Sequence, residues 1–275
     1  MQIASASSAR PVGTLLREWR QRRRLSQLDL ALDASISTRH LSYVETGRAT
    51  PSRAMVLHLA EQLEVPLRER NTLLAAAGYA PIYRERSLDD PALQAAREAV
   101  ELVLRAHEPN PALAVDRHWN LISHNQPVLL LLHGVPPELL QPPLNVLRLS
   151  LHPEGLAPKI VNLAAWRTHL FERLRHQIAV SADPALAALL EELQGYPAPP
   201  DADSHNAIDA SAVAVPLQMR TEAGVLSFIS TITVFGTPVD ITLSELAVET
   251  FFPADAATAQ ALRHMSDGQA ASHRP

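Results

Sequence analysis

The sequence predicts a multidomain protein, with an N-terminal all-α bundle of five helices followed by an α+β domain built on an antiparallel sheet. The chain of 275 residues is long enough for about two domains. Residues 12–78 carry apolar residues at helical spacing between helix-start signals, whereas short strand-like runs flank a helical middle from residue 112 onward. Short links between strands favour antiparallel pairing, and segregated helices are typical of the α+β class.

The composition argues against several classes of protein. There is no cysteine, so neither a disulfide framework nor a thiolate metal site can form. The sequence has no run of 18 apolar residues, which argues against a membrane span. Its first ten residues, MQIASASSAR, lack the apolar core of a secretion signal. We therefore expect a cytoplasmic protein.

Charge is divided unequally along the chain. Residues 1–86 hold 13 arginines and 8 acidic residues, whereas residues 87–275 hold 11 basic and 21 acidic residues, and the net charge is −5. A basic N-terminal part joined to an acidic remainder indicates that only the first part meets phosphate groups.

Changes in pattern divide the chain into five segments. We expect a flexible arm over residues 1–11 and the helical domain over residues 12–80. Residues 81–90 have lost periodicity and are predicted to form a linker. The α+β domain is expected over residues 91–265, and residues 266–275 are predicted to be a disordered tail.

Helix-start and helix-stop residues place the five helices of the first domain. The first helix carries one apolar stripe, formed by Val12, Leu15, Leu16 and Trp19. Ser26 and Ser37 are typical N-caps for the second and third helices. Thr50-Pro51 predicts a cap and a first-turn proline for the fourth helix, while Pro66 opens the fifth and Gly78 closes it.

The second domain is expected to begin with a helix from Asp90-Pro91 to about His107. Two strands, a helix and a proline-rich irregular stretch follow, at residues 112–119, 120–125, 126–132 and 136–143. Asn125 is a candidate cap for that helix. Two more helices are predicted, over residues 162–180 and from Asp183-Pro184 to about Gly195. A polar loop, three strands and a final helix complete the domain, at residues 196–205, 212–220, 225–235, 245–252 and from Ala254-Asp255 onward.

Residues 26–53 predict two short helices, of which the second can lie in a DNA major groove. We expect the pair to pack through Leu30, Ala31, Ile36, Leu41 and Val44. The residues left outward are donors, acceptors and cations, which are the types that contact bases and phosphates. These candidates are Gln27, Ser37, Thr38, Arg39, His40, Tyr43, Arg48 and Arg53. The alternative is a plain helical bundle whose polar residues face solvent.

The same stretch holds an ungapped series of matching positions, which are Ser26-Gln27, Leu30-Ala31, Ile36-Ser37, Leu41, Val44-Glu45-Thr46-Gly47-Arg48 and Pro51-Ser52. The series resembles the helix-turn-helix of the XRE, or lambda-repressor-like, transcription factors. This resemblance implies that the second helix is the recognition helix and that Gln27 and Arg48 contact the DNA backbone. Glu45 is expected to serve an internal ion pair or cap. Ser35 stands where many members have glycine, and a positive φ there would cost about 1 kcal/mol.

A second series of residues lies in the α+β region, at Ala114-Val115-Asp116-Arg117-His118-Trp119-Asn120, Asn125, Asn145-Val146-Leu147-Arg148, Trp166 and Pro253-Ala254-Asp255. This series resembles the ligand-binding domain of the MmyB-like regulators. The resemblance implies a PAS-like fold with a five-stranded antiparallel sheet, helices over one face and a cavity between them. It also implies a small-molecule ligand, and a fatty-acid-like ligand has been associated with the group.

Six residues are candidates for lining this ligand pocket, namely Trp119, Trp166, His169, Leu170, Arg173 and Phe228. Apolar walls with few polar groups suit a lipid-like or aromatic effector. At the rim, Arg173, Arg175 or His169 could hold a carboxylate. The alternative is that Trp166 and Phe228 are ordinary core residues and that Trp119 packs a strand.

The sequence does not predict an enzyme. The HExxH, GxSxG, GxGxxG and P-loop patterns are absent. His169 and His176 share a helix face, but no third ligand stands at a fixed spacing. Asp116 and His118 are expected to point to one side of a strand, without a nucleophile nearby. We therefore expect no catalytic residue, no metal site and no cofactor.

The function that these patterns indicate is sequence-specific DNA binding in transcriptional regulation. Two copies are expected to bind a two-fold-symmetric operator in double-stranded DNA as a homodimer. The second domain is expected to bind a small apolar effector, to dimerise, or both. The alternative is a regulator whose second domain has a solid core and docks a protein partner.

Overall fold

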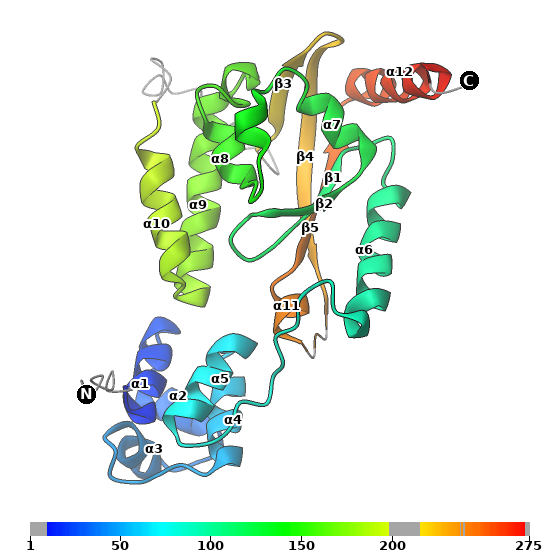
Figure 1. The fold of residues 1–275 in the computed structure, drawn as a ribbon. Helices are drawn as coiled ribbons and strands as arrows, with labels where there is room; N and C mark the ends of the chain where they lie inside the picture. The colour runs from blue at the N-terminus through cyan, green and yellow to red at the C-terminus, as the bar shows by residue number, and fades with distance from the viewer. Residues whose placement is uncertain (1–9, 198–214, 237, 239, 273–275) are drawn as a thin grey trace, which may run out of the picture. The chain divides into compact units, whose positions relative to one another are not determined.

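The computed structural model describes residues 10–197, 215–236, 238 and 240–272, and it divides the chain into two compact units. One unit consists mainly of residues up to Glu85, and the other consists mainly of residues from Arg86 onward. Residues 1–9 of the arm predicted over 1–11 lie outside the described residues. So do residues 198–214, which include most of the loop predicted at 196–205 and the start of the strand predicted at 212–220. Figure 1 shows the helices and strands of both units.

The N-terminal unit is a bundle of five helices, as the sequence predicts. The helices are α1 (Val12–Arg22), α2 (Gln27–Asp33), α3 (Thr38–Glu45), α4 (Arg53–Gln62) and α5 (Leu67–Ala76). Its core is aliphatic, with fully buried leucines from every helix, which are Leu16, Leu30, Leu41, Leu59, Leu73 and Leu74. Of the expected contacts of the helix pair, Ile36 is only half-buried, whereas Ala34 is buried.

Side-chain caps fix where the helices of this unit begin. The Ser26 hydroxyl accepts a hydrogen bond from the Asp29 N–H at 3.1 Å, and the Asp29 carboxylate accepts one from the Ser26 N–H at 2.8 Å. Ser37 caps α3 through the His40 N–H at 3.1 Å. The cap of α4 is Ser52, which accepts from the Met55 N–H, so the predicted Thr50-Pro51 start is wrong by two residues.

Two backbone positions let α1, α2 and α3 pack closely. A Cβ atom on Gly13 would lie 2.3 Å from the carbonyl oxygen of Val44, so only glycine fits where α1 crosses the end of α3. Ser35 has a φ of +53°, which is the conformation that glycine adopts more easily in the turn between α2 and α3. The turn therefore keeps its geometry in spite of the serine.

The second unit contains a five-stranded antiparallel sheet of order β2-β1-β5-β4-β3. Its strands are β1 (Ala112–Val115), β2 (Leu121–His124), β3 (Leu217–Thr221), β4 (Gly224–Val234) and β5 (Ala247–Pro253). The helices and 3-10 turns are η1 (Pro91–Leu93), α6 (Gln94–Ala106), α7 (Gln126–Leu131), η2 (Pro137–Leu140), α8 (Val146–Leu151), η3 (Ala157–Lys159), α9 (Leu163–Ser181), α10 (Pro184–Gln194), α11 (Ile241–Ser244) and α12 (Ala256–Ser272). This arrangement confirms the predicted five-stranded α+β fold.

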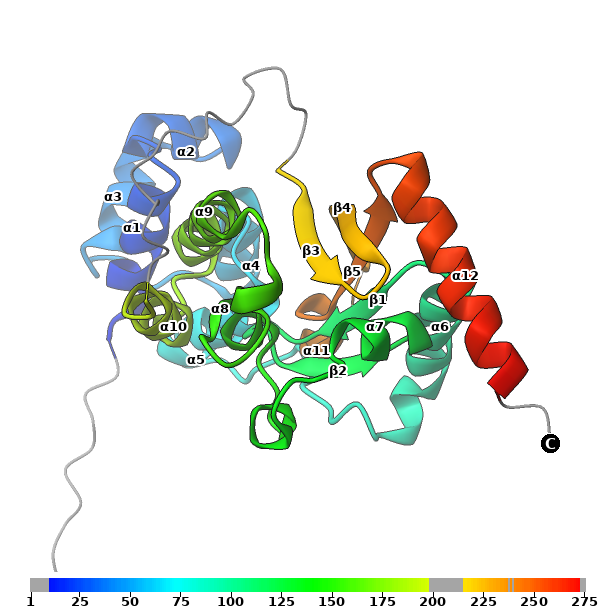
Figure 2. The same ribbon diagram turned by 90° about the horizontal axis from the view of Figure 1, so that it is seen from above.

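Helices lie on both sides of the sheet, with α6 on one side and α8, α9 and α10 on the other (Figures 1 and 2). Alternation along the strands separates two cores. Ala112, Ala114 and Val248 pack with Val100 and Leu104 of α6. The larger core lies on the opposite face, and its fully or nearly fully buried members include Leu113, Met219, Leu226, Phe228, Leu170 and Leu174.

The structure corrects several local predictions in this unit. Helix α8 (Val146–Leu151) follows the irregular stretch predicted at 136–143 and was not among the predicted elements. Asn125 begins α7 without capping it. Its side chain instead accepts from the Ala112 N–H and donates to the carbonyls of Leu104 and Asn110.

Helix α12 reaches into the segment 266–275, which the sequence predicts as a tail. Helix α12 continues through residues 266–272, where alanines favour helix, and only residues 273–275 lie outside the described part. None of the helices in the described part is both long and apolar enough to cross a membrane.

Candidate DNA-binding surface and ligand-binding cavity

Helix α3 presents a cluster of polar and cationic side chains on its outer face. The Arg39 Nε donates to the Tyr43 hydroxyl at 3.1 Å, and its guanidinium lies 5.4 Å from the centre of the Tyr43 ring. Arg48, beyond the end of the helix, lies 5.9 Å from the same ring. Both arginines are exposed, and they extend along one aromatic ring toward solvent.

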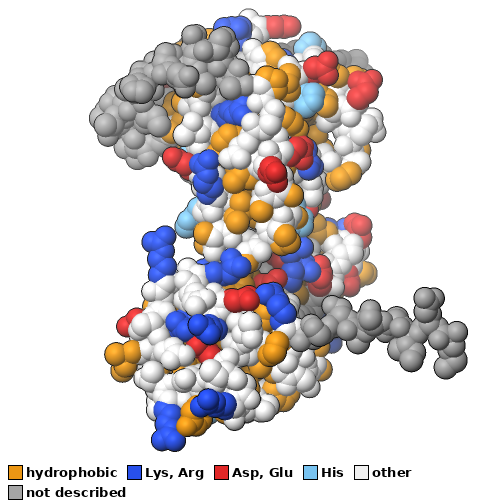
Figure 3. Space-filling view, turned by 90° about the vertical axis from the view of Figure 1, so that its left-hand side faces the viewer, with side chains coloured by type: hydrophobic (Ala, Val, Ile, Leu, Met, Phe, Trp, Pro, Cys, Tyr) orange, Lys and Arg blue, Asp and Glu red, His pale blue; other side chains and the backbone are white. Residues whose placement is uncertain are grey.

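The predicted DNA-contacting residues differ in exposure. Ser37, Arg39, Arg48 and Arg53 are exposed, and Thr38, His40, Tyr43 and Gln27 are half-buried. Among the described residues, no carboxylate forms an ion pair with Arg39, Arg48 or Arg53. Figure 3 shows arginine side chains, in blue, spread over one face of the N-terminal unit. The side chains of Arg39, Arg48 and Arg53 are therefore available to contact phosphates or base edges.

A buried ion pair holds α3 against α1. The Arg20 Nε and Nη2 donate to the two Glu45 oxygens at 2.6 and 2.9 Å, and the Arg20 Nη1 donates to the Leu25 carbonyl. The Glu45 side chain is 1 % exposed. Gln27 Nε2 donates to Glu45 at 2.8 Å, which uses one of the two N–H groups of this half-buried amide. Glu45 thus ties α1, α2 and α3 together, as expected of an internal ion pair.

The second unit contains a small apolar cavity of about 80 Å³ between the sheet and α7, α8 and α9. Trp166 and Leu170, both predicted pocket residues, line it together with Leu113, Met219 and Phe251. The indole N–H of Trp166 donates to the Ser150 hydroxyl at 3.0 Å, which satisfies its polar atom. The walls therefore suit an apolar molecule. The cavity is smaller than the pockets of about 300–1,000 Å³ that hold drug-sized ligands.

The other predicted pocket residues lie around the cavity without lining it. Phe228 is fully buried in the core, and Trp119 is 4 % exposed beneath the guanidinium of Arg173 at 4.1 Å. Arg173 itself is ion-paired with Glu249. His169 stacks on Trp166 with ring centres 5.3 Å apart. None of these groups offers an unpaired positive charge to a ligand carboxylate in the described structure.

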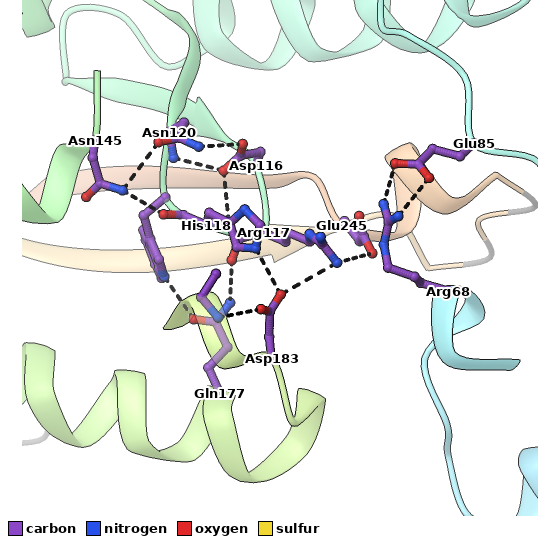
Figure 4. Close-up of polar contacts among 12 residues, drawn as sticks. Arg68, Glu85, Asp116, Arg117, His118, Asn120, Asn145, Gln177, Asp183 and Glu245 are labelled. Carbon is purple, nitrogen blue, oxygen red and sulfur yellow. Dashed lines mark hydrogen bonds and ion pairs between the residues drawn. The ribbon is translucent and has the colours of Figure 1, made fainter. Parts of the chain in front are cut away.

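A polar network joins the turn between β1 and β2 to α9, α10 and α11 (Figure 4). The Asp116 carboxylate accepts from the N–H groups of His118 and Asn120, and Trp119 has a φ of +69°, so these residues form a tight turn. The prediction that Asp116 and His118 point to one side of a strand is therefore wrong. A local Asp hydrogen-bonding to the backbone two residues on is the signal that could have identified the turn.

Asp183 is the acceptor of this network at the start of α10. His118 Nε2 lies 2.9 Å from its carboxylate, and Arg117 lies 3.5 Å from both Asp183 and Glu245. Burial raises the pKa of Asp183, but the Ala185 N–H, His118 and Arg117 together outweigh it and lower the pKa. The network therefore has a structural role, in which His118, Arg117 and the Ala185 N–H stabilise the ionised carboxylate of Asp183. Among the described residues, no three His, Asp or Glu side chains gather closely enough to hold a metal ion.

His169 should make the stability of the second unit depend on pH. Burial and the neighbouring Arg173 lower the pKa of His169, against the opposite effect of Glu249 and Glu172. Below the ordinary histidine pKa of about 6.5, the unfolded chain takes up a proton that the folded unit resists, so stability falls as pH falls. We expect a thermal melting midpoint lower at about pH 5.5 than at about pH 7.5, with a smaller difference in His169→Gln.

His264→Gln is the matched control for this measurement, because His264 is exposed on α12 and its replacement should leave the difference unchanged. Equal pH dependence in His169→Gln and His264→Gln would show that His169 does not carry the effect.

The fold and these two sites define a class: a DNA-binding transcription regulator with a helix-turn-helix unit and a ligand-binding domain. Comparison with protein families gives the particular family. Residues 96–265 match the MmyB-like transcription regulator ligand binding domain, and residues 11–73 match a helix-turn-helix domain. Because the first match covers more than half of the chain, the protein belongs to the MmyB-like transcription regulator family.

One curated relative is similar to about a quarter of the chain. It is the uncharacterized HTH-type transcriptional regulator RghRB of Bacillus subtilis (strain 168), 40 % identical over 76 residues, which are 27 % of this chain and 52 % of the relative. The chain thus spans about half the length of this relative, and the similarity concerns the DNA-binding class only.

Proposed function

We propose that the protein binds a two-fold-symmetric operator in double-stranded DNA as a homodimer, and that its second domain senses a small apolar effector, of which a fatty-acid-like molecule is one case. The outer face of α3 carries this proposal. Ser37 presents the N-terminus of the helix, and Arg39 and Arg48 extend toward solvent beside Tyr43. Recognition helices of such dimers lie in successive major grooves about 34 Å apart.

In this proposal the two domains keep the bounds expected from the sequence, 12–80 and 91–265, joined by a linker at 81–90. Thr38, Arg39, His40 and Tyr43 contact bases, and Ser37, Arg48 and Arg53 contact phosphates. Gln27 contacts a phosphate through the second N–H of its amide, because Glu45 engages only one of the two. A cytoplasmic location stays a prediction.

Arg39→Ala should weaken operator binding by about 1–3 kcal/mol and relax the base preference at one position of each half-site, because arginine is the side chain best suited to reading guanine. The measurement is a titration of operator DNA followed by fluorescence anisotropy, together with site selection by the variant. Arg105→Ala, an exposed arginine of the other unit, is the matched control and should bind as the parent does. Unchanged base preference in Arg39→Ala would remove Arg39 from base recognition.

The effector half of the proposal is supported by the apolar cavity against Trp166 and Leu170. An effector changes DNA affinity only if it binds one arrangement of the protein better than another. Native mass spectrometry of the purified protein, compared with the denatured sample, tests this half. A dimer carrying one small molecule per chain is the expected result, and a monomer that stays monomeric at high concentration would contradict the dimer.

A second candidate function is supported by the size of the cavity. At about 80 Å³ it is smaller than the roughly 150 Å³ cavity that holds a benzene molecule in an engineered protein. A second domain with an essentially solid core would dock a protein partner in place of an effector. Binding of an apolar molecule in the cavity would decide against this alternative.

A further inference from the structure

The apolar cavity of the second unit has two polar groups in its wall apart from the indole of Trp166. They are the Ser150 hydroxyl and the Glu249 carboxylate. Ser150 accepts from the Trp166 indole, so its own hydroxyl hydrogen can still be donated. A carboxylate in an otherwise apolar cavity is unfavourable unless it is paired, so its surroundings indicate what the cavity admits.

Glu249 lies on the central strand β5, and its side chain is 6 % exposed. Arg173 Nη1 and Nη2 both donate to the same oxygen, Oε1, at 2.9 and 3.0 Å. Within the described residues, the second oxygen accepts no hydrogen bond. An ionised carboxylate has room for about four hydrogen bonds, so Glu249 has acceptor capacity left on the cavity side.

Arg173 holds Glu249 in this position and does not itself line the cavity, although its buried Nε has no hydrogen-bond partner among the described residues. Its guanidinium stacks on Trp119 and shares both terminal nitrogens with Glu249. Burial and the neighbouring Arg173 lower the pKa of His169, which favours its uncharged form. A ligand carboxylate at this place would meet a like charge, whereas a hydroxyl or ammonium group would meet an unused acceptor.

We propose that the effector is an apolar molecule whose head group is a hydrogen-bond donor, a hydroxyl or a protonated amine in place of a fatty-acid carboxylate, and that this donor binds the unused oxygen of Glu249. This inference rests on the proposed effector function of the cavity. Because the cavity is small, Leu131 and Met219 must move to admit the molecule. Both side chains also line a neighbouring surface groove, so they form a movable wall between groove and cavity.

Three probes of one chain length test the head group: decan-1-ol, decylamine and decanoate, each titrated into the full-length protein by calorimetry. The alcohol and the amine should bind roughly tenfold or more tightly than decanoate, as a hydrogen bond to a charged group allows. Glu249→Gln should reduce the preference for decylamine over decanoate by roughly the same factor. Tightest binding by decanoate would overturn the inference and direct the head group to Lys159 and Arg220 on the groove.

Glu192→Gln is the matched control, because Glu192 also pairs with an arginine, Arg148, but does not line the cavity. It removes the same charge and should leave the head-group preference unchanged. If Glu249→Gln does not fold, the double variant Arg173→Met/Glu249→Leu removes both charges and should bind the alcohol and decanoate about equally.

The outcomes separate this inference from the function on which it rests. Equal binding of all three probes, unaffected by Glu249→Gln, would leave the effector function standing and overturn the donor preference. Failure of all three probes to bind would contradict the apolar-effector function, and the inference with it.

Discussion

Glu45→Ala is expected to destabilise the N-terminal unit by about 3–5 kcal/mol, which is a large part of the stability of a small domain, and to abolish DNA binding. The variant leaves the buried guanidinium of Arg20 without its partner, at a side-chain exposure of 10 %. It also releases Gln27, so α1, α2 and α3 lose their common contact. The recognition surface on α3 depends on that contact although Glu45 does not face DNA.

The measurement is urea unfolding of the full-length protein, with operator binding followed in parallel. Glu18→Ala is the matched control, because Glu18 pairs with Arg10 in the same unit at side-chain exposures of 37 % and 64 %. Exposed pairs contribute only about 0–1 kcal/mol, so this variant should bind DNA normally. The double variant Arg20→Met/Glu45→Leu should recover part of the lost stability. Similar behaviour of Glu45→Ala and Glu18→Ala would contradict the role of the buried pair.

Trp166→Ala is expected to destabilise the second unit by about 3–5 kcal/mol, because it deletes a ring that is 3 % exposed and leaves a void beside the existing cavity. The variant also removes the hydrogen bond to Ser150 and the stacking on His169. DNA binding by the N-terminal unit should survive wherever the variant stays folded. Trp166 is therefore both a core residue and a wall of the cavity.

Thermal unfolding followed by near-ultraviolet circular dichroism measures this effect, analysed as separate transitions because a two-domain chain does not unfold in two states. Trp166→Phe keeps most of the aromatic volume and should lose clearly less stability. Full stability of Trp166→Ala would show that this side chain does not support the core.

Signals that lie close together in the sequence predict this protein well. Ser26 and Ser37 cap their helices as expected, because an N-cap depends only on the three or four residues after it. The cap of α4 is Ser52, whereas Thr50-Pro51, two residues earlier, is also typical of a cap followed by a first-turn proline. The five-stranded sheet agrees with what the resemblance to the MmyB-like domain implies, and the short links between strand-like runs favour its antiparallel pairing.

Pairs that are distant in the sequence could not be predicted. Arg20 and Glu45 are 25 residues apart, and Arg173 and Glu249 are 76 apart, so no local pattern joins either pair. The sequence predicts Arg173 at the rim as a cation that could hold a ligand carboxylate. In the structure Arg173 forms an ion pair with Glu249. The polar part of the cavity wall depends on the packing of β5 against α9, which no local sequence pattern predicts.

Backbone geometry also escaped the sequence. Trp119 adopts a positive φ, which large residues rarely do, so the strand predicted through residue 119 ends at Val115. The hydrogen bonds of Asp116 to two backbone N–H groups hold this turn. Helix α8 is short and follows several prolines, and such a helix gives little periodic signal.

Selection of binding sites from random double-stranded DNA by the full-length protein tests the central claim most directly. The account predicts enrichment of an inverted repeat whose half-sites are centred about 34 Å apart, or a multiple of that distance, because two α3 helices related by two-fold symmetry would occupy successive major grooves. Arg39→Ala should enrich the same spacing with one base position relaxed. Enrichment of no sequence, or of a single asymmetric half-site without a partner, would contradict a dimeric, sequence-specific regulator.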